Sequence, residues 1–170
     1  MKRWLAFLPL VALALLAVLF IGYSLKRNPQ VQPDAMVGKP MPALSLPDLA
    51  TGRPVALAEA AKGPVLVNFF ASWCAPCEIE HPELIRLQAR GVPIVGIAYK
   101  DAPDNSAAFI ARLGDPFASK LVDRDGRVGL EFGVTGVPET FLIASDGTIL
   151  AKHSGPLTEA DSEAMLAKAR

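Results

Sequence analysis

The cysteines in the stretch Trp73–Cys77, which reads Trp-Cys-Ala-Pro-Cys, constrain this chain more than any other feature of its sequence. They are the only two cysteines among 170 residues, they follow a continuous apolar run, Val65–Phe70, and they open a segment with helical spacing. Cysteines three positions apart at a helix start lie on one face, close enough to form a disulfide. Cys74 also meets the free backbone N–H groups and the dipole of that helix, which stabilise a thiolate. The pattern indicates thiol–disulfide exchange.

Two other uses of these cysteines have to be weighed. A purely stabilising disulfide is one, although closing so short a loop stabilises a fold little on the chain-entropy model. A zinc or copper site is the other, since Cys74, Cys77 and His81 are spaced for one helical face and are suitable ligands. A fourth ligand is not evident, because His153 is far along the chain. We therefore predict a redox pair, no metal, and a surface position for His81.

An uncharged stretch from Trp4 to Tyr23 predicts that the N-terminal segment crosses a membrane. Its length matches the ~20 residues with which a helix spans the hydrocarbon core. The stretch is longer than the apolar part of a signal peptide and has a poor cleavage site at 20–24, so we expect an uncleaved anchor at 4–25. The amino terminus tips the charge balance towards a cytoplasmic position for residues 1–3. In a bacterium the rest of the chain would lie in the periplasm, where disulfides persist.

The chain beyond this anchor divides into a linker and one domain. Prolines are frequent in 26–42, and proline-rich segments act as extended spacers. The remaining range, 43–170, has the length of one ordinary domain. The formal net charge of zero and the lack of a basic patch argue against nucleic-acid binding.

Apolar patterns and turn signals predict an α/β domain. Strands are expected at 43–46 and 55–57 as a loose hairpin, at 65–70 and 93–99 as buried strands, and at 120–123, 140–144 and 148–153. Helices are expected at 76–89, 101–113, 128–132 and 158–168. This order predicts a mixed central sheet with helices on both faces.

The spacing of apolar residues also predicts which side of the two long helices faces the core. In the helix at 76–89 the inward residues would be Ile79, Leu84, Ile85 and Leu87. In the helix at 101–113 they would be Ala108, Phe109, Ile110 and Leu113. Pro82 lies inside the first helix and should kink it, because proline removes one backbone donor.

Three segments together resemble the thioredoxin superfamily. Val65–Cys77 is similar to the strand and active site of that superfamily, and Pro82 falls at its helix kink. Gly133–Pro138 resembles the superfamily segment that ends in a cis-proline. The resemblance implies a thioredoxin-like fold.

A narrower likeness is to the membrane-anchored thiol:disulfide interchange proteins of cytochrome c maturation, the DsbE/CcmG type. It is carried by Glu80 and by the stretches 98–101 and 136–143. The helix after Pro103 matches the extra helical insert of this branch, and the likeness includes the N-terminal anchor, so that it covers nearly the whole chain.

This likeness implies a periplasmic reductase, bound to the inner membrane, that keeps the haem-attachment cysteines of apocytochrome c reduced. It implies electrons from a membrane thiol–disulfide donor of the DsbD or CcdA type, the haem-ligation complex as a further partner, and no cofactor. A general envelope reductase or oxidase stays open as an alternative. A thiol peroxidase is disfavoured, because such enzymes need Thr or Ser where Ala71 stands.

Thiol chemistry and the likeness together assign roles near the cysteines. Cys74 is expected to be the more exposed nucleophile, whose thiolate forms a mixed disulfide with the substrate, and Cys77 to resolve it. Thioredoxin has a buried Asp where this chain has Asn68. The likeness implies that Glu80 takes over as the buried acid and moves a proton to or from Cys77. The alternative for Glu80 is a solvated position on the helix surface.

Four further residues are expected to contact the substrate. Trp73 would cover the dithiol, unless it is a core tryptophan. Pro138 would be cis and turn the chain beside the sulfurs, unless it is an ordinary loop proline. Val137 would then offer its main chain to an extended substrate, as in strand addition. Glu139 would line the groove by resemblance, the alternative being a surface charge at a strand edge.

Overall fold

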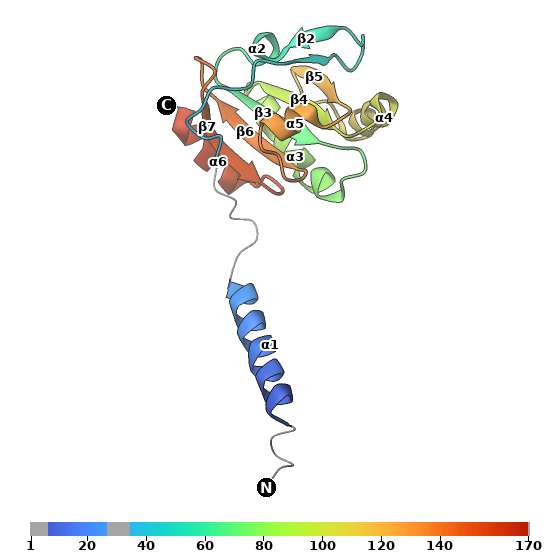
Figure 1. Cartoon of the computed structure of the whole chain (residues 1–170). Helices are drawn as coiled ribbons and strands as arrows, with labels where there is room; N and C mark the ends of the chain where they lie inside the picture. Colours follow the sequence, from blue (N-terminus) through green and yellow to red (C-terminus); the bar gives the residue numbers. More distant parts are fainter. Residues whose placement is uncertain (1–6, 27–34, 170) are drawn as a thin grey trace. The chain divides into compact units, whose positions relative to one another are not determined.

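The computed structural model describes residues 7–26 and 35–169 of the chain, which divides into two compact units, 1–33 and 34–170. The described part of the first unit contains helix α1 (Leu8–Lys26) (Figure 1). Its apolar side chains between residues 9 and 22 are exposed. Among the described residues, no helix is both long enough and apolar enough to cross a membrane. The expected anchor begins at Trp4, which lies outside these residues, as do residues 1–3 and residues 27–34 of the expected linker.

The second unit is built on a mixed sheet, as predicted (Figure 1), and this sheet has five strands. Its strands are β3 (Val65–Phe70), β4 (Ile94–Tyr99), β5 (Ser119–Asp123), β6 (Glu139–Ile143) and β7 (Ile149–Ser154), in the order β5-β4-β3-β6-β7. The first three are parallel, and β6 and β7 continue the sheet in antiparallel pairing. Strand β3 is central and buried throughout, which is why its sequence is an almost unbroken apolar run.

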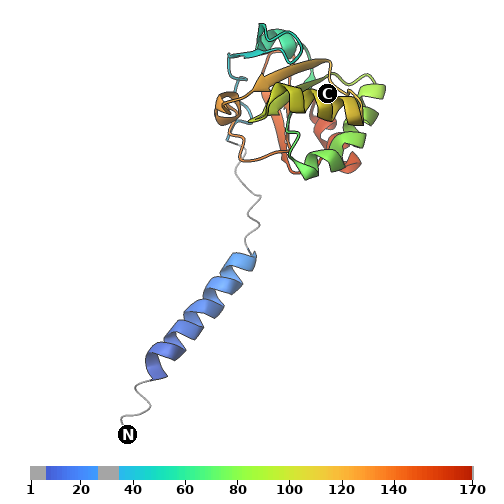
Figure 2. The same ribbon diagram turned by 90° about the vertical axis from the view of Figure 1, so that its right-hand side faces the viewer.

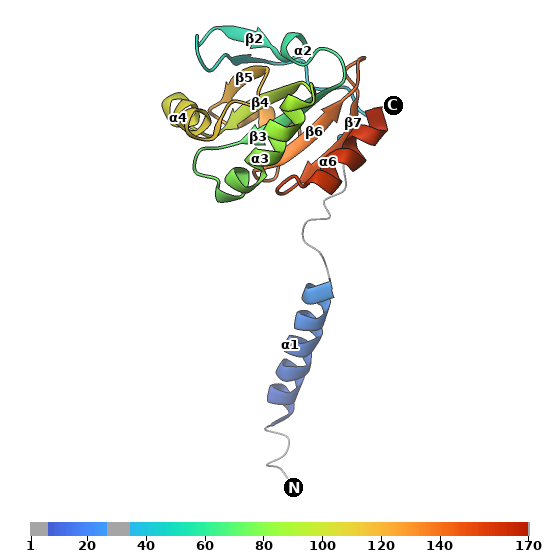
Figure 3. The same cartoon turned by 180° about the vertical axis from the view of Figure 1, so that it is seen from behind.

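Helices cover both faces of the sheet, which confirms the predicted layers. One face carries α3 (Ala75–Ala89), α4 (Pro103–Leu113) and α6 (Glu159–Leu166) with the short helix η2 (Ala167–Ala169) (Figure 3). The other carries α2 (Leu57–Ala60), α5 (Arg127–Glu131) and the hairpin of β1 (Ser45–Pro47) and β2 (Pro54–Ala56). Figure 2 turns the domain so that α3 and α6 lie on one side of the sheet and α5 on the other.

Alternate residues of β3 pack into two separate hydrophobic cores, because successive side chains of a strand point to opposite faces. Leu66 and Phe70 join the core under α3, α4 and α6, and Val67 and Phe69 join the core under α5 and the hairpin. The Phe70 ring stacks on the rings of Phe109 and Phe117, with centroids 5.7 and 5.0 Å apart. This stack fixes the helical insert α4 against the end of β3, where the cysteines follow.

The inward faces of the two long helices differ from the predicted ones. Ile79 is 72% exposed, and the buried stripe of α3 includes the polar residues Glu80 and His81. In α4, Ala108 is exposed and Ser106 is buried. Leu84, Leu87, Phe109 and Ile110 are buried as predicted, and the predictions for Ile79 and Ala108 were wrong. The buried polar groups find hydrogen-bond partners on other parts of the chain, which local hydrophobicity does not reveal.

Short segments cover both outer strands of the sheet. At the β7 edge, Gly38 N–H donates to Ile149 O at 2.8 Å, and Ile149 N–H donates to Lys39 O at 2.9 Å. At the β5 edge, Leu49 N–H donates to Lys120 O at 2.8 Å. Residues 38–41, which belong to the linker predicted at 26–42, are therefore hydrogen-bonded to the sheet and to the turn before β7.

Candidate active site

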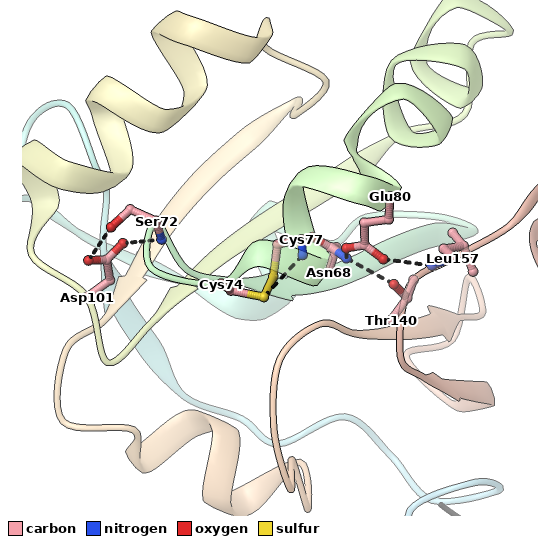
Figure 4. The surroundings of a disulfide bond; sticks show 8 residues. All are labelled: Asn68, Ser72, Cys74, Cys77, Glu80, Asp101, Thr140 and Leu157. Carbon is pink, nitrogen blue, oxygen red and sulfur yellow. Dashed lines mark hydrogen bonds between the residues drawn. A yellow bond between two sulfur atoms is a disulfide. The ribbon is translucent and has the colours of Figure 1, made fainter.

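Cys74 and Cys77 form a disulfide at the start of α3, with their Cα atoms 5.3 Å apart (Figure 4). Cys74 is the N-cap residue, and its Sγ accepts a hydrogen bond from the Cys77 N–H at 3.2 Å. A thiolate at Cys74 would accept the same bond and meet the positive end of the helix, so both effects would stabilise the thiolate of the reduced protein. Cys74 is 4% and Cys77 1% exposed, so the first is the more accessible, as expected, by a small margin.

Asp101 ties the loop between β3 and α3 to the loop that follows β4. Its buried carboxylate accepts hydrogen bonds from Ser72 N–H at 2.7 Å and from Ser72 Oγ–H at 2.9 Å. It also accepts bonds from Ala102 N–H and from Ser106 Oγ–H. The sequence analysis missed this role, although β3 and β4 are parallel neighbours whose carboxyl ends meet, which is where sites of α/β sheets lie.

Trp73 is 61% exposed next to Cys74, so it is not a core tryptophan. Its indole N–H donates to the Lys100 carbonyl at 3.3 Å, which holds the ring beside the β4–α4 loop. Lys100 has a φ of 49°, in the left-handed region that few residues other than glycine adopt. An exposed indole at this place is available to a substrate, and the predicted role as a cover for the sulfurs stays a prediction.

Glu80 is buried behind the disulfide on α3, with 1% exposure, which rules out the alternative of a solvated surface residue (Figure 4). Its Oε1 accepts a hydrogen bond from Asn68 Nδ2 at 2.8 Å, and its Oε2 accepts one from Leu157 N–H at 2.9 Å. Burial raises the pKa of Glu80 to about 7, because it outweighs the stabilisation of the carboxylate by these two bonds. The group can therefore change protonation near neutral pH.

Asn68 orients this carboxyl from the central strand. Its fully buried side chain uses Nδ2 twice, for Glu80 and for Thr140 Oγ1 at 3.0 Å. Its Oδ1 has no hydrogen-bond partner among the described residues. The amide cannot titrate, so the proton-carrying group on this face is Glu80.

The peptide bond between Val137 and Pro138 is cis, as predicted. Glu139 pairs with Phe69 across the β3–β6 ladder, so Pro138 lies beside Phe70 at the end of β3, where the loop to Cys74 begins. Residues 70 and 138 are thus brought together from distant parts of the sequence. Substrate contact by Val137 and Pro138 stays a prediction.

Glu139 differs from both of its predicted positions. It is 2% exposed, and Lys152 Nζ lies 2.9 Å from its Oε2. Glu139 is therefore neither a surface charge nor a residue whose side chain lines an open groove, because this side chain is buried and ion-paired. The ladder also places it on the opposite face of the sheet from Glu80, because Asn68 pairs with Thr140 and Phe69 with Glu139.

His81 is buried, which corrects its expected surface position. Its Nε2 is 2.9 Å from the Gly114 carbonyl, and its ring packs edge-on against Phe109 and Phe117. Burial lowers the pKa of His81. Within residues 7–26 and 35–169, no group of three or more His, Cys, Asp or Glu side chains is arranged to hold a metal ion. The structure therefore does not bring His81 and the cysteines together as ligands.

Comparisons with known proteins place the chain in a family. The model of the Redoxin family matches residues 36–167. The thiol:disulfide interchange protein HelX of Rhodobacter capsulatus is 42% identical over 164 residues, which are 94% of this chain and 91% of that protein. DsbE of Pseudomonas fluorescens is 43% identical over 161 residues, 94% of this chain and 89% of that protein. The chain belongs to the DsbE type of thiol:disulfide interchange proteins.

Solved structures agree with this DsbE-type fold. A putative DsbE from Chlorobium tepidum superposes with a TM-score of 0.67 at 30% identity, over 78% of this chain and 94% of that one. A thio-disulfide isomerase from Thermus thermophilus does so with a TM-score of 0.65 at 29% identity, over 78% and 96%. This DsbE-type protein is a thiol:disulfide oxidoreductase, and Cys74 and Cys77 are its one pair of cysteines.

Proposed function

We propose that this protein reduces the disulfide between the two haem-attachment cysteines of apocytochrome c during cytochrome c maturation. The observation that carries the proposal is a buried carboxyl, Glu80, placed behind the Cys74–Cys77 disulfide in a DsbE-type chain. A group with a pKa of about 7 suits proton transfer with a thiol near neutral pH. The resemblance to the DsbE/CcmG type supplies the substrate.

The reduced protein would act in two displacement steps. The Cys74 thiolate attacks one sulfur of the substrate disulfide, and the other substrate sulfur leaves as a thiolate. Cys77 then gives its proton to the Glu80 carboxylate and attacks Cys74, which releases the second substrate thiol. Two electrons pass to the substrate, and the Cys74–Cys77 disulfide remains. A membrane donor of the DsbD or CcdA type would return the two electrons, and the haem-ligation complex would receive the reduced apocytochrome.

The proposal includes a location in the periplasm, on an anchor in the bacterial inner membrane formed by residues 4–25. The uncharged stretch from Trp4 to Tyr23 and the exposed apolar side chains of α1 support it. Residues 4–6 of this span lie outside the described part of the chain. The test is to fractionate bacteria expressing the full chain: the protein should stay with membranes after alkaline carbonate washing, and a chain lacking residues 1–33 should be soluble. Release of the full chain by carbonate would argue against an integral anchor.

The substrate assignment can be tested by trapping. Cys77→Ser should accumulate a mixed disulfide between Cys74 and an oxidised peptide that carries the two haem-attachment cysteines, because the resolving thiol is missing. Cys74→Ser is the matched control and should trap nothing. Mass spectrometry of the adduct identifies both partners.

The same variant separates the proposal from the alternative of a general envelope reductase or oxidase. In cells, Cys77→Ser should carry apocytochrome c as its main disulfide-linked partner. A broad set of other envelope proteins in its place would overturn the substrate assignment, while leaving the oxidoreductase activity intact.

A further inference from the structure

Lys152 is a cation whose side chain is largely enclosed on the face of the sheet opposite to Glu80. Its side chain on β7 is 8% exposed, and its Nζ contacts Glu139 Oε2 at 2.9 Å. This contact is too poorly aligned for a hydrogen bond, so it is an ion pair. Nζ also donates to the Gly133 carbonyl at 2.8 Å and lies 5.5 Å from the centre of the Phe141 ring. Lysine is rarely buried so fully without a partner, which makes the surroundings of this one informative.

The other carboxylate oxygen of Glu139 binds Thr135, which lies two residues after Gly133 in the segment 133–138. Its Oε1 accepts hydrogen bonds from Thr135 Oγ–H at 2.8 Å and from Thr135 N–H at 3.3 Å. Ser154 Oγ–H donates to the same oxygen at 3.2 Å. Lys152 and Glu139 together therefore fix the main chain at residues 133 and 135, just before the cis bond at Pro138.

Near the C-terminal end of that segment, the main-chain groups of Val137 are free to pair with another chain. Within the described residues, no hydrogen bond is made by the main chain of Val137, whereas Pro138 O accepts one from Gly155 N–H at 2.9 Å. The segment is thus fixed on both sides of Val137, whose peptide groups are unused. Backbone pairing of an extended substrate with such a residue needs the segment to be held in place, because strand addition relies on main-chain geometry.

We propose that Lys152 is a positioning residue for substrate binding: its ion pair with Glu139 and its bond to Gly133 O hold the segment 133–138 for docking of a polypeptide disulfide. The inference rests on the proposed reduction of a polypeptide substrate. Lys152 would act through the main chain of the segment and would touch neither the substrate nor the sulfurs.

The test compares a polypeptide substrate with a small one. Lys152→Met removes the bond to Gly133 O and also the ion pair that holds Glu139, the acceptor for Thr135, so the attachment of the segment is lost at residue 133 and weakened at residue 135. The ratio of kcat/KM for a disulfide peptide to kcat/KM for hydroxyethyl disulfide should fall about tenfold, mainly through KM of the peptide. Lys152→Arg keeps the charge and should restore much of the ratio. Lys120→Met is the matched control, because it breaks a surface ion pair with Asp115 at the opposite edge of the sheet and should not move the ratio.

A double variant keeps the inference testable if Lys152→Met unfolds. Glu139→Gln with Lys152→Met removes both buried charges, which usually recovers stability, but does not restore the bond to Gly133 O. The peptide ratio should stay low in this double variant. A ratio that returns to the wild-type value together with stability would overturn the positioning role. The peptide used is the one that the wild-type protein reduces fastest, so failure of the haem-site peptide as a substrate counts against the proposed function and not against this inference.

Discussion

The side-chain amide of Asn68 donates a hydrogen bond to Glu80 across 2.8 Å, joining β3 to α3 in the buried layer behind the disulfide. A neutral amide stabilises the carboxylate less than a cation would, so burial still dominates and the pKa of Glu80 stays high, at about 7. The Glu80 side chain therefore has a fixed orientation and can gain or lose a proton near neutral pH.

The pH dependence of stability should report this pKa directly. An ordinary glutamate titrates near 4.5, so between pH 4.5 and 7 the folded oxidised protein binds more protons than the unfolded chain. The stabilisation is complete below the unfolded pKa and is lost as the pH rises through the folded one, by about 3 kcal/mol. Urea unfolding of the oxidised protein from pH 4.5 to 8 measures the change.

Glu80→Gln is the control for this slope, since it keeps the shape of the side chain and removes the titration. His81 acts in the opposite direction: its lowered pKa costs stability as the pH falls below its unfolded value of 6.5. The difference between wild type and variant cancels the His81 contribution. A difference that does not vary with pH would contradict the assignment to Glu80.

Asp101 should be important for stability although it makes no ion pair among the described residues. Asp101→Ala leaves the donors of Ser72 and Ser106 without their acceptor, which should lower the free energy of unfolding by about 3 kcal/mol. Chemical denaturation measures the loss. Asp104→Ala, at an exposed position in the first turn of α4, should cost under about 1 kcal/mol. Equal losses in the two variants would show that the buried hydrogen bonds contribute little.

Gly96 on β4 should not accept a side chain. A Cβ there would lie 2.7–2.9 Å from ring atoms of Phe117, whose ring is stacked on Phe70 and has little room to move. Gly96→Ala should therefore destabilise the domain by about 1–3 kcal/mol. Gly136→Ala, where a Cβ would meet no atom within 4 Å, provides the comparison. Thermal unfolding of the two variants decides: a melting temperature of Gly96→Ala as high as that of Gly136→Ala would show that the ring yields.

The closing helix should depend on its capping box. Thr158 Oγ accepts a hydrogen bond from Asp161 N–H, and the Asp161 carboxylate accepts one from Thr158 N–H. Thr158→Ala should lower the free energy of unfolding by about 1 kcal/mol, and Thr158→Ser should recover most of it. If serine is no better than alanine in denaturant titrations, the hydroxyl is not the stabilising group.

The sequence was sufficient to predict the sheet and the reactive centre, because both depend on local patterns. The run Val65–Phe70 became β3 with these bounds, and the capped segment after Thr158 became α6. Cys74 and Cys77 are only three positions apart in sequence, so their pairing needed only a helix start. The prediction of a cis bond at Pro138 came from the resemblance to the thioredoxin superfamily.

The surroundings of the centre could not be predicted in the same way. Glu80 meets Leu157, Asp101 meets Ser72, and Glu139 meets Lys152, each across a separation that only the folded sheet closes. Ile79 was placed inward because it is apolar, yet the inward place is taken by Glu80, whose partners lie on other elements. A local hydrophobicity pattern contains no information about such partners.

The segments that cover the outer strands of the sheet affect how this protein meets other chains. Residues 38–41 pair beside the start of β7, and Leu49 pairs beside β5. Uncovered edge strands can pair with strands of other chains. An oxidoreductase that acts on unfolded polypeptides would be exposed to such pairing at every turnover. With both outer strands partly covered, the sheet offers few main-chain groups for unwanted pairing, and under the proposed function an extended substrate would pair instead with the free main chain of Val137.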